Sequence, residues 1–156
     1  MLLDGGMMNL KQRENPYSRL HSNSTMKHET WCLKFLIFSQ INGRYGSAID
    51  QLRFRFENYW APAHGGRGGV EKICHWGEKI TRVRGVESTI YGGFLVSIEF
   101  IGQSGRSCRI GRFSHWTFDV AHSGFYLSHL SGSLGKWPGP GGIDVIKSVQ
   151  LHWKKM

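Results

Sequence analysis

The stretch GSAIDQLRFRF, residues 46–56, decides the fold class of this chain. Within it, apolar side chains alternate with charged ones, namely Leu52, Phe54 and Phe56 with Arg53 and Arg55. A period of two is that of an extended strand with one face on a core and the other in water. Gly46 stands before the strand, at a place where a tight turn favours glycine. The stretch therefore predicts a turn followed by a half-buried β-strand.

The same alternation recurs in three later segments of the chain. They are Phe94–Phe100, Trp116–Val120 and Val149–Trp153. In the last of them His152 alternates with apolar neighbours, which predicts an imidazole on the exposed face. No segment sustains the 3.6-residue period of a helix, so the sequence predicts an all-β fold.

Three of the strand segments share one pattern. In residues 46–54, 92–100 and 141–151, glycine precedes a strand that ends apolar, polar, apolar. The separations between the three segments are nearly even. The pattern therefore predicts three copies of one sheet unit arranged about a threefold axis.

The chain is strongly basic, with 20 Lys and Arg against 11 Asp and Glu and a formal net charge of +9. Such a surface attracts polyanions, which include nucleic acid, anionic lipid and sulfated polysaccharide. Charge alone does not choose among them, and a solvated basic surface without a partner fits equally well. One alternative function is a polyanion binder that uses strand cations, namely Arg53, Arg55, Arg82 and Arg84. No motif of a known nucleic-acid-binding fold supports a nucleic-acid partner.

The three cysteines are predicted to be small core residues, although one pair is able to close a disulfide. Their positions, Cys32, Cys74 and Cys108, give no CxxC spacing, so no metal site is expected. Adjacent residues on a strand point to opposite faces, so Cys74 and His75 do not form a catalytic pair.

Residues 1–30 are polar and lack periodicity, and they are predicted to form a flexible or irregular extension. Residues 31–156 are predicted to form one domain. No signal peptide is recognisable, and no apolar stretch approaches the ~20 residues that a membrane-spanning helix needs. The compartment stays open on these grounds.

Several motifs recur in a known order. They are IDQLRFRF at 49–56, GGRGG at 65–69, EKITRVRG at 78–85, SIEFIGQSGRSCRIG at 97–111, LSG at 130–132 and LHW at 151–153. In this order and spacing, residues 49–153 resemble the jacalin-related lectins, especially the zymogen granule protein 16 branch. The resemblance implies a β-prism I fold with three four-stranded Greek-key sheets and pseudo-threefold symmetry. The first sheet is complete only if the polar N-terminus supplies a strand.

The resemblance also implies sugar-binding loops at one end of the prism. In the family, a glycine-rich loop and a Gly-x-x-x-Asp loop offer backbone N–H groups and one carboxylate to sugar hydroxyls. The matching residues of the first repeat are Gly46, Ser47, Ala48, Ile49 and Asp50, with Gly65 and Gly66 beside them. No metal or cofactor is needed for this chemistry.

The last repeat offers a second candidate loop with Gly142, Ile143 and Asp144. Counting back from the LHW motif places Lys147, and not Asp144, at the position of the family's acid. Two interpretations stay open: a β-bulge restores Asp144, or this site has lost its carboxylate.

Arg106 and Ser107 fall where the resemblance implies a loop beside the sugar. Together with Arg67, they are candidates for recognising sulfated or otherwise anionic glycans; the alternative is that they are solvated hairpin residues. Trp137 lies in a Pro/Gly-rich loop, where it either stacks on a sugar or packs under its own loop.

The sequence thus predicts a carbohydrate-binding protein that is not an enzyme, with mannose-type or sulfated glycans or glycoproteins as partners. By resemblance the protein is expected to be secreted or to reside in a secretory-granule lumen. The alternative is a β-prism protein-interaction or polyanion-binding module that has lost specific sugar binding.

Overall fold

The computed structural model describes residues 30–34, 37–56, 59–90, 93–139 and 141–156. The described residues form strands β1 (Thr30–Lys34), β2 (Gln40–Tyr45), β3 (Ile49–Phe56), β4 (Tyr59–Trp60), β5 (His64–Gly65), β6 (Val70–His75), β7 (Ile80–Ser88), β8 (Phe94–Gly102), β9 (Ser107–Ile110), β10 (Phe118–Ala121), β11 (Phe125–Lys136) and β12 (Asp144–Lys155). The predicted all-β fold is confirmed. The prediction for residues 1–29 lies outside the described residues.

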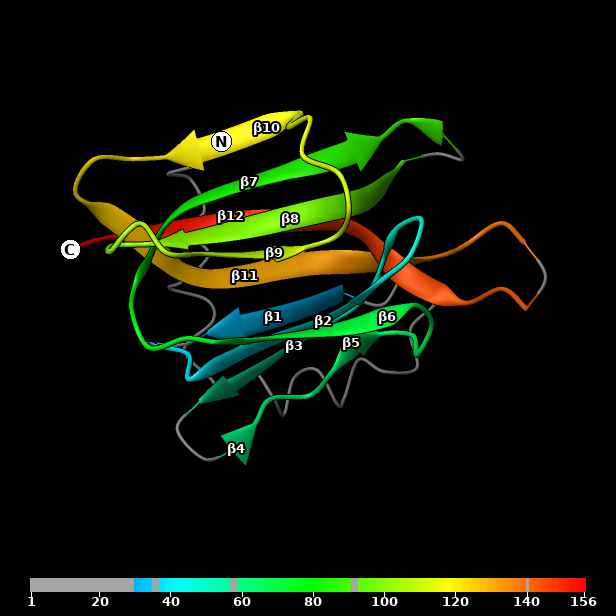
Figure 1. Ribbon diagram of the computed structural model, residues 1–156, viewed down its shortest axis with the longest axis horizontal. Coiled ribbons are helices and arrows are strands. Elements are labelled where there is room, and N and C mark those ends of the chain that lie inside the picture. Colours follow the sequence, from blue (N-terminus) through cyan, green and yellow to red (C-terminus); the bar gives the residue numbers. More distant parts are fainter. Residues whose placement is uncertain (1–29, 35–36, 57–58, 91–92, 140) are drawn as a thin grey trace.

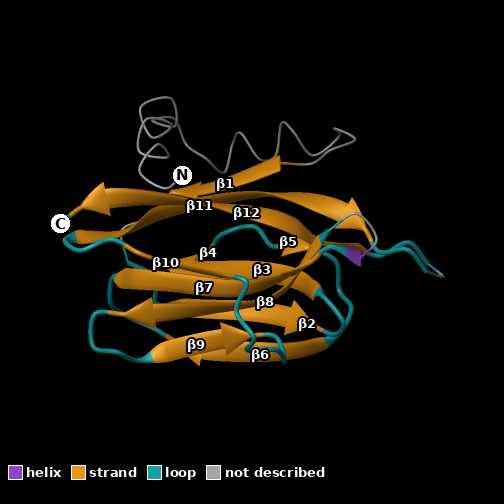
Figure 2. Ribbon diagram, turned by 90° about the horizontal axis from the view of Figure 1, so that it is seen from above, coloured by secondary structure: helices purple, strands orange, loops and turns teal. Residues whose placement is uncertain are grey.

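The strands form three antiparallel sheets, as a β-prism requires (Figures 1 and 2). Their orders are β1-β11-β12, β10-β7-β8-β9 and β4-β3-β2-β6, with β5 also paired to β3. The first sheet has three described strands instead of four, and it joins the N-terminal β1 to the C-terminal β12. In the third sheet β4 and β5 both pair with β3, separated by a segment that contains Pro62. Proline cannot donate to a β-ladder, so a single strand is divided there.

The predicted internal repeat takes the form of three hairpins, β2–β3, β7–β8 and β11–β12. Each second strand carries a β-bulge close to its start, where one extra residue lacks a partner. In β3 this residue is Asp50, because the pairing passes from Ile49 directly to Gln51. The corresponding residues are Val96 in β8 and Lys147 in β12. These three residues occupy equivalent positions around the pseudo-threefold axis.

The repeat extends to the partner strand. Two residues beyond each bulge, the paired residue is glycine: Leu52 faces Gly43, Ile98 faces Gly85 and Val149 faces Gly132. A methyl group at Gly43 would overlap Ile110, and one at Gly85 would overlap Phe118. In these two hairpins, glycine is therefore required because a side chain of another strand fills its space.

The three second strands, β3, β8 and β12, contact one another in the interior. Their buried residues form the centre of the core: Leu52, Phe54, Ile98, Phe100, Leu151 and Trp153. The Phe54 and Phe100 rings meet edge to face with centroids 6.1 Å apart. Each such side chain contributes roughly 1.5–3 kcal/mol by leaving water. This shared core holds the three hairpins, and hence the loops at their ends, in fixed relative positions.

The alternation overstated the exposure of the polar faces of β8 and β12. In β8, Ser97 is fully buried and Glu99 is 7 % exposed. The Glu99 carboxylate accepts a 2.7 Å hydrogen bond from Arg84 Nε, and the Arg84 guanidinium lies over the Trp116 ring. The predicted water-facing side of β8 is therefore covered, with its charge paired.

The prediction that His152 is exposed is wrong. Its ring is fully buried and stacks on the ring of His129 with centroids 4.1 Å apart. His152 Nε2 lies 2.9 Å from Ser131 Oγ. Mutual stacking and this hydroxyl make the buried position tolerable for a polar ring.

A disulfide links Cys74 of β6 to Cys108 of β9, so the one pair that the sequence left able to close is formed. Cys108 is 1 % exposed in the core and Cys74 packs against it, as expected for small core residues. The disulfide spans 34 residues and joins two sheets. Closing such a loop stabilises the fold by roughly 4 kcal/mol in the chain-entropy account. Cys74 is near the end of β6 that pairs with Gln40, far from the β2–β3 turn. The side chain of Cys32 lies outside the described residues.

Candidate functional site

The predicted loops of the first and last repeats lie together at one end of the prism. The β2–β3 turn, the glycine-rich connection between β5 and β6, and the β11–β12 loop all reach this end (Figure 1). They meet because the first hairpin and the last hairpin pack through β3 and β12 in the core.

The carboxylate of Asp50 is the central chemical group of this site. Asp50 is 6 % exposed and occupies the bulge at the start of β3. Its Oδ2 lies against the backbones of three glycines: Cβ atoms placed on Gly46 and Gly68 would be 3.8 and 3.4 Å away, and one on Gly69 would overlap it. Within the described part of the chain, neither carboxylate oxygen accepts a hydrogen bond. The wall of glycines thus leaves an acceptor group without a donor.

The glycine-rich loop connects the two predicted sites. Gly66 N donates to the carbonyl of Asp50 at 2.8 Å and to the carbonyl of Asp144 at 3.1 Å. Gln51 Nε2 donates to the carbonyl of Gly66 at 2.9 Å. This close approach of the Gly66 backbone to Asp144 requires glycine, since a Cβ at Gly66 would lie 2.7 Å from the Asp144 carbonyl oxygen. The structure therefore brings Asp50, Gly65 and Gly66 together with Ile143 and Asp144.

Arg44 fixes the other half of the same loop. Its Nε is 3.1 Å from the carbonyl oxygens of Arg67 and Gly68, and its second terminal nitrogen donates to Gly69 at 3.1 Å. No motif in the sequence pointed to Arg44. Its position in β2, opposite Gln51 and next to the bulge, is what aims it at the loop.

Two opposing effects act on the proton affinity of Asp50. Burial raises the pKa of its carboxyl above the ordinary value, and the nearby charge of Arg44 opposes this with a smaller effect. A carboxylate that is costly to bury and lacks internal donors gains most from a ligand that donates hydrogen bonds to it. Adjacent hydroxyl groups are one such ligand.

The end of the last hairpin differs in its chemistry. The bulge residue there is Lys147, which is exposed, so the register places a lysine at the position that Asp50 holds in the first repeat. Asp144 lies at the start of β12 and pairs with Lys136, with Nζ and Oδ1 2.5 Å apart. Of the two interpretations left open by the sequence, the register supports the one in which the last repeat has lost its acid. Gly142 adopts a positive φ of 51°, and Ile143 is 41 % exposed.

Arg106 and Ser107 do not join this site. They lie at the β8–β9 turn, at the other end of β8 from Phe94 and the β7–β8 loop (Figure 1). Arg106 is 3.5 Å from the Glu78 carboxylate, and its guanidinium lies over the Trp76 ring.

The cations of the polyanion-binding alternative are largely engaged. Arg82 makes a bidentate pair with Asp119 at 2.7 and 2.6 Å, and Arg84 is paired with Glu99. The guanidinium groups of Arg53 and Arg55 lie over the Trp60 ring.

Trp137 packs within its own end of the molecule. Its ring is half-buried and meets the Phe94 ring at a centroid distance of 5.3 Å. The sequence offered packing and sugar stacking as equal alternatives, and the observed contact is a packing one.

Two further observations concern the described residues alone. They contain no group of three or more His, Cys, Asp or Glu side chains placed to hold a metal ion. None of their helical segments has the length and apolar character needed to cross a membrane.

No family model matches the sequence, and no curated protein matches it. Solved structures do match. A prostate-specific WGA16 glycoprotein lectin superposes with a TM-score of 0.66 at 20 % identity, covering 84 % of this chain and 94 % of that one.

Two plant lectins show the same likeness. The galactose-binding lectin from Champedak, solved with Gal(beta)1,3-GalNAc, has a TM-score of 0.64 at 17 % identity and covers 80 % of this chain and 98 % of its own. AcmJRL, a mannose-binding jacalin-related lectin from Ananas comosus, has a TM-score of 0.61 at 19 % identity, covering 80 % and 85 %. The three sheets, the repeated bulge and these superpositions agree with the resemblance seen in the sequence: the chain has the β-prism fold of the jacalin-related lectins.

Proposed function

We propose that this protein is a non-catalytic carbohydrate-binding protein of the lectin type. In this proposal the ligand is a hexose, held between the β2–β3 turn and the glycine-rich loop. The Asp50 carboxylate accepts hydrogen bonds from two adjacent hydroxyls, and backbone N–H groups of the glycine loop donate to the same hydroxyl oxygens.

One observation carries the proposal: Asp50 is 6 % exposed as a residue, its carboxylate lies against glycine backbone, and no hydrogen bond to this carboxylate is formed within the described residues. A carboxylate that is partly desolvated and has no protein donor gains from a ligand that supplies hydrogen bonds. The fold supports the proposal as well, because the proteins that share it include lectins solved or described with galactose and mannose ligands.

For the sugar, we propose a mannose-type hexose, with an anionic substituent accepted beside it. Asp50 itself disfavours a sulfate or carboxylate in its own contact because like charges repel. Arg67 is exposed at the tip of the glycine loop, and its backbone carbonyl is held by Arg44. In this proposal the exposed Arg67 guanidinium binds a sulfate on a neighbouring ring of the glycan.

The test compares Asp50→Asn with Asp144→Asn by calorimetric titration of methyl α-mannoside and a sulfated mannoside at low and moderate salt. Loss of a charged acceptor costs ~1.5–3 kcal/mol for each hydrogen bond, so Asp50→Asn is expected to weaken binding of both ligands at least about tenfold. Asp144→Asn is the matched control and is expected to leave affinity unchanged, since its carboxylate is paired to Lys136.

Two results would contradict the proposal. One is unchanged hexose binding in Asp50→Asn. The other is binding to sulfated chains alone, with a steep salt dependence and no effect of either substitution, because that behaviour belongs to a polyanion surface.

We also propose that the protein is secreted or resides in a secretory lumen. The Cys74–Cys108 disulfide supports this, since such bonds form and persist in oxidising compartments. Mass spectrometry of the protein from its native cells without reduction tests it: two free thiols at these positions would count against the proposal.

A further inference from the structure

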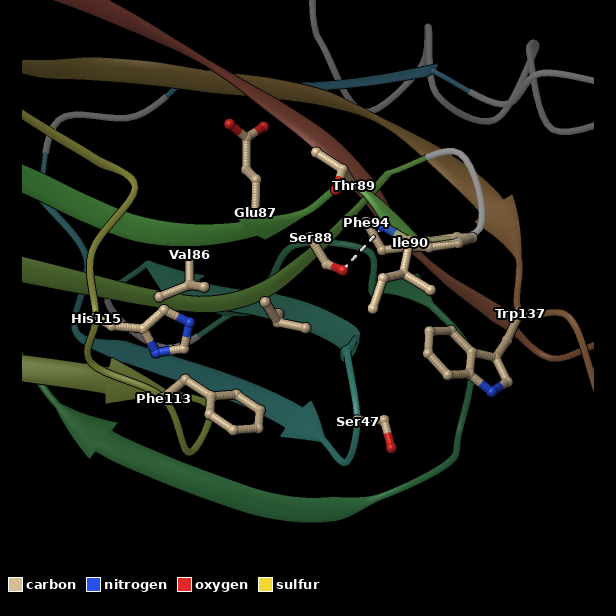
Figure 3. Close-up of a pocket in the computed structure, with 11 residues that line it drawn as sticks. Ser47, Val86, Glu87, Ser88, Thr89, Ile90, Phe94, Phe113, His115 and Trp137 are labelled. Carbon is tan, nitrogen blue, oxygen red and sulfur yellow. Dashed lines mark hydrogen bonds between the residues drawn. The ribbon is translucent and has the colours of Figure 1, made fainter.

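A pocket of about 490 Å³ opens beside the β2–β3 turn, whose Ser47 is one of the residues that line it (Figure 3). It lies between the β7–β8 loop, the segment after β9 and the first residues of the β11–β12 loop. Its volume is within the range of sites that hold small organic ligands.

The floor of the pocket is set by the pseudo-threefold repeat. Val96 lines it, and Val96 is the bulge residue of β8, at the position that Asp50 holds in β3. Val86 and Phe94 line the same floor, and all three side chains are buried, at 2–8 % exposure. The second repeat therefore presents an apolar side chain at the bulge where the first presents a carboxylate. The polar lining residues Glu87, Ser88 and Thr89 come from the end of β7 and the β7–β8 loop, and none of them occupies the bulge.

Exposed apolar side chains also line the opening of the pocket. Ile90 is 62 % exposed and Phe113 is 41 % exposed, and Trp137 stands on the opposite side against Phe94 (Figure 3). The Phe113 ring meets the His115 ring edge on at 5.7 Å. Rings from three separate segments thus converge on one opening. Aromatic rings arranged in this way favour a flat or ring-shaped apolar group.

The pocket is continuous with the Asp50 loop. Ser47 lines the pocket and belongs to the β2–β3 turn. Gly46, the preceding residue of the same turn, lies against the Asp50 carboxylate. Ala48, from the same turn, is buried in one apolar cluster with Val86, Phe94 and Val96. A ligand bound at Asp50 therefore has this apolar opening on the other side of a single turn.

We infer that the pocket receives the apolar, ring-sized aglycone of a glycoside whose sugar is bound at Asp50. This inference rests on the proposed function and narrows its ligand class to glycoconjugates with an apolar group next to the sugar. Polar oligosaccharides would use the Asp50 site without the pocket.

The experiment compares methyl and 4-nitrophenyl glycosides of one hexose, mannose, by calorimetric titration. Burying an aryl ring in such a pocket is expected to tighten binding roughly 10- to 100-fold over the methyl glycoside. In the Ile90→Ala/Phe113→Ala double variant this ratio is expected to fall below about threefold, while affinity for the methyl glycoside stays unchanged. Val70→Ala is the matched control, because Val70 is 56 % exposed on β6 and does not line the pocket.

A second readout separates this inference from the proposed function. Methyl NMR signals of Ile90 and Val96 are expected to shift with the aryl glycoside and not with the methyl glycoside. If the methyl glycoside binds and the aryl glycoside binds no tighter, the inference is overturned and the sugar site stands. If the methyl glycoside fails to bind but the aryl glycoside shifts these signals, the pocket stands and the sugar site is overturned. No binding and no shift with either glycoside would overturn both.

Discussion

The first and last hairpins share a β-bulge at the same position, but the bulged residues differ in chemistry. Each has a bulge at the start of its second strand, and the bulged residue is Asp50 in one and Lys147 in the other. Asp50 is buried against glycine backbone, whereas Asp144 is in a solvent-exposed pair with Lys136. An acid that follows a glycine closely in sequence therefore does not by itself bring its carboxylate against the glycine loop. The Asp50 carboxylate meets the glycine loop from the bulge, whereas the Asp144 carboxylate, three residues before the bulge, pairs with Lys136.

The middle hairpin makes the comparison sharper. Its bulge residue is Val96, and an apolar pocket takes the place of a polar site. Three equivalent backbone positions therefore carry an acid, an apolar residue and a base. Repetition fixes where the three groups lie, while each side chain decides what its position can bind.

The largest expected effect comes from filling the space in front of Asp50. Gly69 has a φ of 75°, and a methyl group there would overlap Asp50 Oδ2 and the Tyr45 carbonyl oxygen. Gly69→Ala is expected to weaken hexose binding roughly 10- to 100-fold, since overpacking of this kind displaces the groups it meets. Calorimetric titration measures the affinity, and urea unfolding measures the stability.

The control for this prediction is Gly141→Ala in the last hairpin. Gly141 has a φ of 92° and nothing within 4 Å of an added Cβ, so it shares the backbone strain without the overlap. It is expected to lose stability but to keep its affinity. Equal affinity losses in the two variants would mean that strain, and not the space at Asp50, controls binding.

A smaller effect is expected on the free energy of unfolding at acidic pH, through His64 of the first repeat. His64 is 4 % exposed on β5, directly before the glycine loop, and burial lowers its pKa to about 4 from an ordinary value of 6.5. Between these two pH values the unfolded chain binds more protons than the folded one, so stability falls as pH falls through this window. The loss from this group approaches about 3 kcal/mol at pH 4.

Urea unfolding at pH 7 and pH 4.5 tests this for His64→Gln against the native sequence. The variant is expected to lose less of its free energy of unfolding on acidification. His115→Gln removes an exposed imidazole by the same substitution and provides the comparison. An identical pH dependence in His64→Gln would contradict the argument.

The smallest expected effect is a difference in thermal stability between the Asp50→Asn and Asp144→Asn variants. Burial raises the pKa of Asp50, so the ionised group costs stability as pH rises above the ordinary value of 3.8. Asp50→Asn is therefore expected to raise the midpoint of thermal unfolding at pH 7 while binding is lost. Asp144→Asn removes an exposed ion pair and is expected to cost ~0–1 kcal/mol. A lowered midpoint for Asp50→Asn would show that attraction to Arg44 outweighs the cost of burial.

Much of the fold was predictable from local pattern. Leu52, Phe54 and Phe56 indicated a strand because alternation is a property of the backbone itself. The same reasoning failed at His152 and Glu99, since burial of the second face depends on what other elements cover it. The Gly-x-x-x-Asp motif identified Asp50, but Arg44 was missed because its role depends on contacts 23–25 residues away.

The sequence alone determined the class of the protein: alternating strands, glycine at the turns and three similar segments specify an all-β chain with threefold repetition. These are short-range features, set by steric and hydrophobic preferences of neighbouring residues. Only the tertiary structure decided which residue of each repeat fills the bulge, that Cys74 meets Cys108, and that Gly66 hydrogen-bonds to both Asp50 and Asp144. These depend on strand register and on the packing of three sheets around one core, which no local stretch of sequence fixes.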